Sequence, residues 1–288
     1  MVEMNDLGPP TEIQWCPGCG NFGILRALKK ALVNLGQPAH NIFLVSGIGQ
    51  SGKTPHFIDL NGFHTLHGRA VPIATGAAVS NPNLHVIVHG GDGDLLGEGL
   101  GHLLHGARRN VDIAVLIHNN GIYGLTKGQY SPTTPHGQVT KTSPPPSGVP
   151  MEPVNPLAQA IVGGATFVAR SFAGDIDHLT DIILKAVKHE GFAVVEILQP
   201  CVVFNKVWTW DFFNERVYQI SDDEHDSSNK AKAIQLAFEW GDRIPLGIFY
   251  AEQRRTLQRD LYLPEDGGLY NHQSNLEELQ DIIDDMLI

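Results

Sequence analysis

The sequence predicts an α/β fold, a doubly wound and mostly parallel sheet with helices on both faces. Several short segments, such as residues 85–88 and 111–117, look like strands that are buried on both sides, which is typical of covered parallel sheets. Segments with apolar residues at helical spacing lie between these strands. Strands and helices therefore alternate along the chain, as they do in α/β domains.

The expected elements follow in chain order. Apolar residues recur at helical spacing over residues 21–35, and Gly36 is a plausible end of that helix. We expect further helices over residues 69–80, 97–109, 156–162, 175–189, 229–240 and 275–287, the last with Ser274 and Glu277 as a capping box. The expected strands are residues 41–45, 85–88, 111–117, 167–169 and 193–198. Residues 121–150 are polar and rich in proline, which predicts a long functional loop.

Length and composition limit the function classes. The chain has 288 residues and is 42% hydrophobic, enough for a sizeable core. We expect one domain over residues 12–215 and a C-terminal extension over 216–288, packed on the domain or on a partner. The net charge of -11 argues against a nucleic-acid partner. With neither a signal peptide nor an apolar run of membrane-spanning length, we expect a cytoplasmic protein.

Polar residues follow two neighbouring strands where each strand ends. Gly91-Asp92-Gly93 comes directly after one strand and Asn119-Asn120 after the next, with residues 94–118 between them. Ligands of open parallel sheets bind at the carboxyl ends of strands. Glycines allow a diphosphate to approach the backbone closely, and carboxylate and amide oxygens suit Mg²⁺. The pair predicts a metal-diphosphate clamp.

This arrangement resembles the thiamine-diphosphate motif, and other blocks narrow the family. Over roughly residues 12–215 the chain is similar to the β subunit of the two-subunit 2-oxoacid:ferredoxin oxidoreductases. The matching blocks are Trp15-Cys16-Pro17-Gly18-Cys19-Gly20, Ser46-Gly47-Ile48-Gly49 with Lys53, Pro55 and His56, Leu66-His67-Gly68-Arg69-Ala70, Tyr123-Gly124-Leu125-Thr126-Lys127-Gly128-Gln129 and Gln199-Pro200-Cys201.

The resemblance implies a reaction and a set of partners. A 2-oxo acid would be oxidatively decarboxylated with thiamine diphosphate and Mg²⁺, the acyl group would pass to coenzyme A, and electrons would reach ferredoxin through an iron–sulfur cluster. We favour 2-oxoglutarate as the substrate, with pyruvate next. The implied partner is a larger α subunit, in an αβ or (αβ)₂ assembly, which would supply the pyrimidine-binding carboxylate and the coenzyme A functions.

By the same resemblance, Asp92, Asn120 and the Ile122 carbonyl would bind Mg²⁺. His67 would face the reacting centre or the diphosphate, and Lys53 would bind the substrate carboxylate. The alternatives are that His67 is a histidine of the core and that Lys53 is a lysine of the surface, each without a role in the site. The residues expected around the cofactor are Ile48, Gly49, Gln50, Ser51, Leu66, His67, Gly68, Arg69, Gly91, Gly93, Asp94, Tyr123, Gly124, Leu125 and Thr126.

The cysteines depart from the family pattern at one position. Relatives hold a [4Fe–4S] cluster with four thiolates, and three of these match Cys16, Cys19 and Cys201, whereas Gln50 stands at the fourth. Asp59, His56 or His64 could complete the cluster, or three irons could bind. Otherwise the site formed by the cysteines could be empty, or it could hold Zn²⁺ with water. We expect a retained cluster.

Two rival functions stay open. One is a thiamine-dependent decarboxylase or synthase subunit without a cluster, against which the three cysteines argue. The other is a non-catalytic, zinc-binding subunit, which predicts no binding of thiamine diphosphate.

Overall fold

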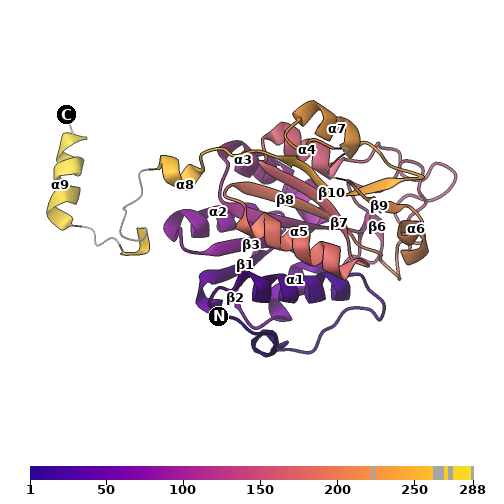
Figure 1. Ribbon diagram of the computed structural model, residues 1–288, viewed down its shortest axis with the longest axis horizontal. Coiled ribbons are helices and arrows are strands. Elements are labelled where there is room, and N and C mark those ends of the chain that lie inside the picture. Colours follow the sequence, from indigo (N-terminus) through magenta and orange to yellow (C-terminus); the bar gives the residue numbers. More distant parts are fainter. Residues whose placement is uncertain (222, 224, 262–268, 272–274, 287–288) are drawn as a thin grey trace.

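The computed structural model describes residues 1–221, 223, 225–261, 269–271 and 275–286 (Figure 1). Within these residues the chain forms an eight-stranded sheet in the order β2-β1-β3-β4-β8-β7-β10-β9. All neighbouring strands are parallel except β10, which runs antiparallel to β7. The expected fold class, a mostly parallel α/β sheet, is confirmed.

The strands have the following bounds. The large sheet consists of β1 (Ile42–Ser46), β2 (Asn61–His64), β3 (His85–Gly91), β4 (Ile113–Asn119), β7 (Phe167–Phe172), β8 (Phe192–Leu198), β9 (Val217–Gln219) and β10 (Ile244–Ala251). A separate pair consists of β5 (Ile122–Tyr123) and β6 (Gln129–Tyr130), which lies within the expected long loop.

Helices cover both faces of the sheet (Figure 1). One face packs on α1 (Asn21–Leu35) and α5 (Ile176–Lys188), and the other on α2 (Ala70–Ser80), α3 (Leu100–Arg109), α4 (Pro156–Gly163) and α7 (Lys230–Ala237). The remaining helices are α6 (Trp210–Asn214), α8 (Leu257–Asp260) and α9 (Leu276–Asp285), with shorter turns η1 (Met4–Leu7), η2 (Ala39–Asn41), η3 (Ser51–His56), η4 (Gly93–Glu98) and η5 (Leu269–Asn271).

Successive side chains of the central strands alternate between the two cores. In β4, Leu116 packs in the core with α1 and α5, whereas Val115 and Ile117 pack in the core with α2, α3 and α4. This is the period of two that strand geometry imposes. Because both faces are buried, β4 and β8 have no exposed side chain.

The structure differs from the sequence-based expectation in several elements. The helix expected from residue 97 is preceded by a π-helical turn, η4, that starts directly after Asp92. The strands β2, β9 and β10 were not expected; all four residues of β2 are exposed, and their sequence has no alternation of apolar and polar side chains. Helix α9 lies within the expected C-terminal helix. Ser274 and the side chain of Glu277 lie outside the described residues, and so does the proposed capping box.

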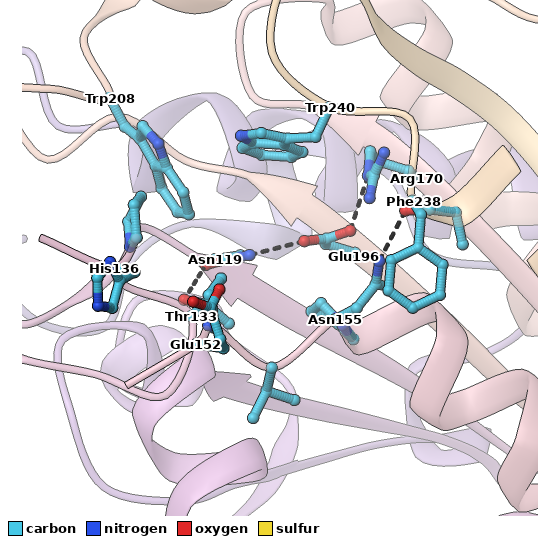
Figure 2. A pocket seen from close by; sticks show the side chains of 15 residues that line it. Asn119, Thr133, His136, Glu152, Asn155, Arg170, Glu196, Trp208, Phe238 and Trp240 are labelled. Atoms are coloured by element: carbon cyan, nitrogen blue, oxygen red, sulfur yellow. Dashed lines mark hydrogen bonds and ion pairs between the residues drawn. The ribbon is translucent and has the colours of Figure 1, made fainter. Parts of the chain in front are cut away.

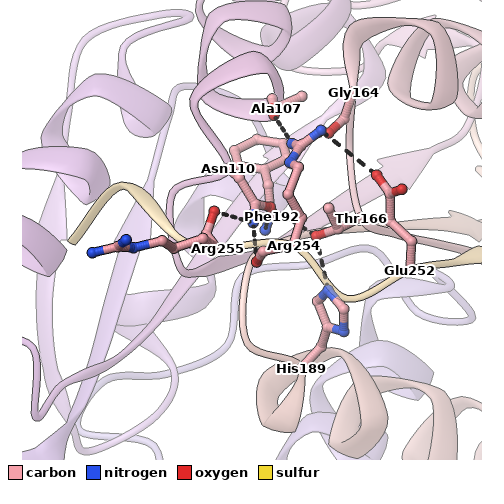
Figure 3. A network of polar contacts seen from close by, with 9 residues as sticks. All are labelled: Ala107, Asn110, Gly164, Thr166, His189, Phe192, Glu252, Arg254 and Arg255. Carbon is pink, nitrogen blue, oxygen red and sulfur yellow. Dashed lines mark hydrogen bonds and ion pairs between the residues drawn. The ribbon is translucent and has the colours of Figure 1, made fainter. Parts of the chain in front are cut away.

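The segment after residue 215 is joined to the sheet by a buried amide (Figure 3). Asn110 Nδ2 donates to the carbonyl oxygens of Arg254 and Arg255 at 3.0 and 3.2 Å. Asn110 Oδ1 accepts from Thr166 Oγ1 at 2.7 Å and from the Phe192 N–H at 2.9 Å. One side chain therefore ties the chain beyond β10 to β7 and β8. Among the described residues, no helix is both long enough and apolar enough to cross a membrane.

Candidate active site

Four adjacent parallel strands, β1, β3, β4 and β8, bring their carboxyl ends to the same edge of the sheet. These ends lead into Gly47 to Ser51, Gly91 to Gly93, Asn119-Asn120 and Gln199 to Cys201. Sequence segments that are far apart thus meet at the position where open α/β sheets bind ligands. Most of the expected site residues lie along this edge.

Asp92 is the most buried carboxylate at this edge, with 1% of its surface exposed. The Ser131 hydroxyl donates to Asp92 Oδ2, and Thr133 Oγ1 lies 2.6 Å from the same oxygen. The backbone N–H groups of Gly93 and Asn120 also donate to Asp92. Burial nevertheless raises the pKa of Asp92 above its usual range, because desolvation outweighs these hydrogen bonds.

The surroundings of Asp92 fit a metal ion. Among the described residues, no lysine or arginine forms an ion pair with it. A buried carboxylate without a cationic partner is a natural ligand for a hard cation. Asn120 lies beside it, with its Oδ1 accepting the Ile122 N–H at 3.0 Å. The three expected Mg²⁺ ligands are therefore neighbours. The described residues contain no group of three or more His, Cys, Asp or Glu side chains arranged around a metal ion.

Asp94 joins three loops at the cofactor edge. Its Oδ1 accepts the N–H of Gly68 at 2.8 Å and that of Ile48 at 3.0 Å. The same oxygen lies 3.0 Å from His67 Nδ1, which also lies 3.1 Å from Glu98 Oε2. Burial raises the pKa of Asp94. These contacts place His67 between two carboxylates and show Asp94 bound to the backbone of the loops.

Two positions at this edge require glycine, because neighbouring atoms lie too close to the backbone for a side chain. A Cβ added to Gly47 would lie 1.8 Å from Asp94 Oδ2, and one added to Gly93 would lie 2.3 Å from the ring of Tyr123. The Tyr123 hydroxyl in turn donates to the Gly93 carbonyl at 3.0 Å. The backbone of the loop after β3 therefore packs at Gly93 directly against the Tyr123 side chain of the β5–β6 hairpin.

An open cavity of about 730 Å³, a size that suits a cofactor or substrate, is lined by residues of η4, of the β5–β6 hairpin and of the segment that follows it. His67, Tyr123 and Thr126 line it. Leu66 and Leu125 are exposed by 76% and 46%. Lys53 is half-buried in η3 and does not line this cavity. Arg69 contacts His102 through its guanidinium.

The expected thiols meet at a second, smaller cavity beside the first. Cys16, Cys19 and Cys201 line it together with Gln50, and all three cysteines are free thiols. We call this cavity the thiol pocket. The loop with Cys16 and Cys19 is attached to the loop with Cys201, because the Gly20 N–H donates to the Pro200 carbonyl at 3.2 Å. The pocket brings residues 16–19, 50 and 201 together. The other candidates for a fourth ligand, His56, Asp59 and His64, do not line it.

Gln199 connects the thiol pocket with the Asp92 edge. Its Nε2 donates to Cys19 Sγ at 3.4 Å, and its Oε1 accepts from Asn120 Nδ2 at 2.8 Å. Burial raises the pKa of Cys19 to about 11. Hydrogen bonds to sulfur from Gln199 and from the Asn21 backbone act in the opposite direction. One amide therefore contacts an expected cluster ligand and an expected Mg²⁺ ligand.

A chain of buried polar groups continues behind Asp92 to a cavity of about 440 Å³ (Figure 2). Thr133 Oγ1 lies 2.8 Å from Asn119 Oδ1, and Asn119 Nδ2 donates to Glu196 Oε1 at 2.6 Å. Arg170 Nε donates to Glu196 Oε2 at 2.7 Å, both side chains being 1% exposed. Thr133 has one hydroxyl proton, so it can donate a hydrogen bond to Asp92 or to Asn119, but not to both at once.

Sequence reasoning missed Ser131, Thr133 and the bridging role of Gln199. The two hydroxyls lie in the segment expected as a loop, where no spacing points to them. Gln199 belongs to a block that the resemblance had singled out, but only its neighbour Cys201 was given a role.

Comparisons with known proteins agree with this geometry. Residues 45–197 match the family described as thiamine pyrophosphate enzyme, C-terminal TPP binding domain. Residues 201–263 match the family described as the C-terminal part of the pyruvate ferredoxin oxidoreductase beta chain. The first match covers the edge with Asp92 and Asn120, and the second begins at Cys201.

Curated relatives decide the family. The chain is 50% identical over 246 residues to 2-oxoacid:ferredoxin oxidoreductase 1, subunit beta, of Aeropyrum pernix, covering 82% of this chain and 77% of the relative. The chain belongs to the β subunits of the 2-oxoacid:ferredoxin oxidoreductases. This β subunit is also 46% identical over 200 residues to 2-oxoglutarate oxidoreductase subunit KorB of Mycobacterium tuberculosis, covering 69% of this chain and 53% of the relative.

A solved structure has the same fold as this β subunit. It is a 2-oxoglutarate:ferredoxin oxidoreductase from Magnetococcus marinus with 2-oxoglutarate, coenzyme A and succinyl-CoA bound. The TM-score is 0.87 at 43% identity, and the match covers 90% of this chain and 88% of that one. The expected family and the oxidoreductase class are therefore confirmed.

Proposed function

We propose that this β subunit acts on 2-oxoglutarate, which is oxidatively decarboxylated with coenzyme A to an acyl-CoA and CO₂ while two electrons leave for ferredoxin. The observation that carries the proposal is the meeting of the Asp92–Asn120 edge and the thiol pocket at Gln199. Bound thiamine diphosphate would supply the carbanion chemistry that decarboxylation of a 2-oxo acid needs. The residues of this chain hold, orient and shield that cofactor.

The roles of the cofactor residues follow from their contacts. Asp92, the Asn120 side chain and the Ile122 carbonyl would hold Mg²⁺, with Ser131 and Thr133 orienting the Asp92 carboxylate. The glycines of the loops after β1 and β3 would allow the diphosphate to approach the backbone. His67, held by Asp94 and Glu98, faces the open cavity and is our candidate for proton transfer there.

Lys53 remains our candidate for the substrate carboxylate, although it does not line the cavity beside His67. A lysine is suited to this role as a mobile cation on a long side chain.

The three thiols would hold an iron–sulfur cluster that receives the electrons. The three thiols line one cavity together with Gln50, which supports this proposal. Cys19 also accepts hydrogen bonds from Gln199 and from the Asn21 backbone, which are contacts that tune cluster sulfurs.

The preference for 2-oxoglutarate rests on likeness to proteins named for that substrate in Mycobacterium tuberculosis and Magnetococcus marinus. Pyruvate is the second candidate, because the family that matches residues 201–263 is named for it.

The partner of this chain would be an α subunit, in an αβ or (αβ)₂ assembly, as the names of the β-subunit relatives imply. We also propose a cytoplasmic location, because three free thiols suit a reducing compartment.

The decisive experiment is co-expression with the α subunit and anaerobic purification, followed by a panel of 2-oxo acids with a viologen dye as the electron acceptor. We expect reduction with 2-oxoglutarate, coenzyme A, Mg²⁺ and thiamine diphosphate, and a lower kcat/KM with pyruvate. A higher kcat/KM with pyruvate would reverse the substrate assignment. Decarboxylation without dye reduction would favour the cluster-free decarboxylase.

Calorimetry with thiamine diphosphate and Mg²⁺ tests the remaining alternative. A zinc-binding, non-catalytic subunit would show no heat of binding. The Asp92→Ala variant is the matched control, because it removes the expected metal ligand and leaves the thiol pocket unchanged.

A further inference from the structure

Gln50 presents a buried oxygen to the thiol pocket. Its side chain lines the pocket with the three thiols, and its Oε1 is buried with no hydrogen-bond partner among the described residues. A buried carbonyl oxygen without a donor destabilises the folded protein. The fold keeps this oxygen in place, which points to a partner from outside the chain.

The backbone at Gln50 is fixed by the residue that precedes the first cysteine. Trp15 Nε1 donates to the Gln50 carbonyl at 2.8 Å. The Trp15 ring packs edge-on against Phe57, with ring centroids 4.9 Å apart, and against Phe22, at 5.4 Å. Trp15 therefore ties the backbone of Gln50 to the start of the Cys16 loop, and Gln50 lines the same cavity as the three thiols.

The pocket offers three sulfur atoms and one oxygen. We propose that Gln50 Oε1 is the fourth ligand of an iron–sulfur cluster whose other ligands are Cys16, Cys19 and Cys201. This inference rests on the proposed cluster. A neutral amide binds iron more weakly than a thiolate, so the iron beside Gln50 exchanges. The site also carries one negative charge fewer than four thiolates would, which raises the reduction potential.

The exchangeable iron has a defined chemistry. When ferricyanide takes one electron from a [4Fe–4S]²⁺ cluster, the iron beside Gln50 leaves as Fe²⁺ and a [3Fe–4S]⁺ cluster remains. The ferricyanide is reduced to ferrocyanide. Added Fe²⁺ and one electron from dithionite reverse the step. The three thiolates stay bound throughout.

The test compares the wild type with Gln50→Cys and Gln50→Ala, each purified anaerobically as the complex with the α subunit. Iron, sulfide and EPR spectra are measured before and after one equivalent of ferricyanide. We expect the wild type to release one iron and to gain the half-integer-spin signal of a three-iron cluster. Gln50→Cys should keep its iron and have a more negative potential, and Gln50→Ala should lose iron without oxidant.

Equal iron retention in the wild type and Gln50→Ala would overturn the role of Gln50. Equal retention and potential in the wild type and Gln50→Cys would do the same. Iron in Gln50→Cys but not in the wild type would show that Gln50 supports no cluster. Absence of iron from the wild type and from both variants would instead overturn the proposed cluster itself.

Discussion

Asp92 shows at the scale of one residue how the fold prepares for a metal ion. Its two hydroxyl and two backbone donors do not offset the desolvation of its charge, so its pKa is raised. A raised pKa in the folded state means that ionisation destabilises the metal-free protein as the pH rises through that range. Metal binding requires the same ionisation, and the ion then replaces the missing countercharge.

We therefore expect the affinity for Mg²⁺ and thiamine diphosphate to fall as the pH is lowered through the raised pKa of Asp92. The limit for one proton is about tenfold per pH unit. Calorimetry between about pH 5 and pH 8 measures this dependence. Asp92→Asn at the same pH values is the control for titration of the ligand. A wild-type profile parallel to that of Asp92→Asn would contradict the assignment.

Cys19 differs from Cys16 in its surroundings, although both belong to the same short motif. With a pKa of about 11, Cys19 is a thiolate in only about one molecule in a thousand at pH 8 in the absence of a metal. We expect iodoacetamide to modify the exposed Cys16 faster than Cys19 in the metal-free protein. Peptide mass spectrometry over time measures both rates in one sample. Faster modification of Cys19 would show that burial does not protect it.

At the scale of elements, the site depends on close packing of loop backbone against a neighbouring side chain. The turn η4 begins at Gly93, directly against Tyr123 on β5. Such π-helical turns are often found at functional sites. A methyl group at Gly93 must displace Tyr123 and separate the two elements.

Gly93→Ala should weaken binding of thiamine diphosphate by tenfold or more, about 1.4 kcal/mol, and lower the melting temperature. The matched control is Gly101→Ala in α3, where an added Cβ meets no atom within 4 Å. That change should stabilise the helix by roughly 0.5–1 kcal/mol. Calorimetry and thermal unfolding measure both effects. Unchanged binding by Gly93→Ala would show that the contact with Tyr123 is dispensable.

The sequence predicted the elements with strong periodicity and the residues that belong to short motifs. Residues 85–88 were expected as a buried strand and lie in β3, whereas of the expected strand over 111–117 only residues 113–117 lie in β4. β2 was missed because its side chains are exposed, and β10 because it lies in the segment expected as an extension.

At the candidate site, the sequence motifs predicted residues of adjacent loops, but not the residues that form hydrogen bonds with them. Asp92 and Asn120 follow consecutive strands, so their proximity could be inferred from topology. The contact of Thr133 with Asp92 depends on how the chain beyond β5 folds back. No local sequence pattern specifies that this segment folds back to Asp92, because its path depends on tertiary packing.

At the scale of the whole molecule, Asn110 joins the chain ends of α3, β7, β8 and the segment after β10. Its backbone has a positive φ of 52°, which asparagine tolerates better than most residues. All four of its side-chain hydrogen bonds are internal, and the residue is 1% exposed.

Asn110→Ala should lower the free energy of unfolding by about 2–4 kcal/mol, because it leaves buried backbone and hydroxyl groups without hydrogen-bond partners. Exposed Asn83 provides the control, and Asn83→Ala should change stability by less than about 0.5 kcal/mol. Chemical denaturation measures both. A loss for Asn110→Ala as small as that of the control would mean that solvent replaces the lost hydrogen bonds.

The strand order has a consequence for how the protein folds during its synthesis on the ribosome. Every residue of the Asp92 edge and of the thiol pocket lies before residue 205, whereas β10, which pairs with β7 and β9, is made later. On the ribosome, the part of the chain before residue 205 emerges while the β7 edge still lacks its neighbour. Synthesis is slow compared with the folding of small units. The edge of β7 therefore stays unpaired until β10 has been made and pairs with it.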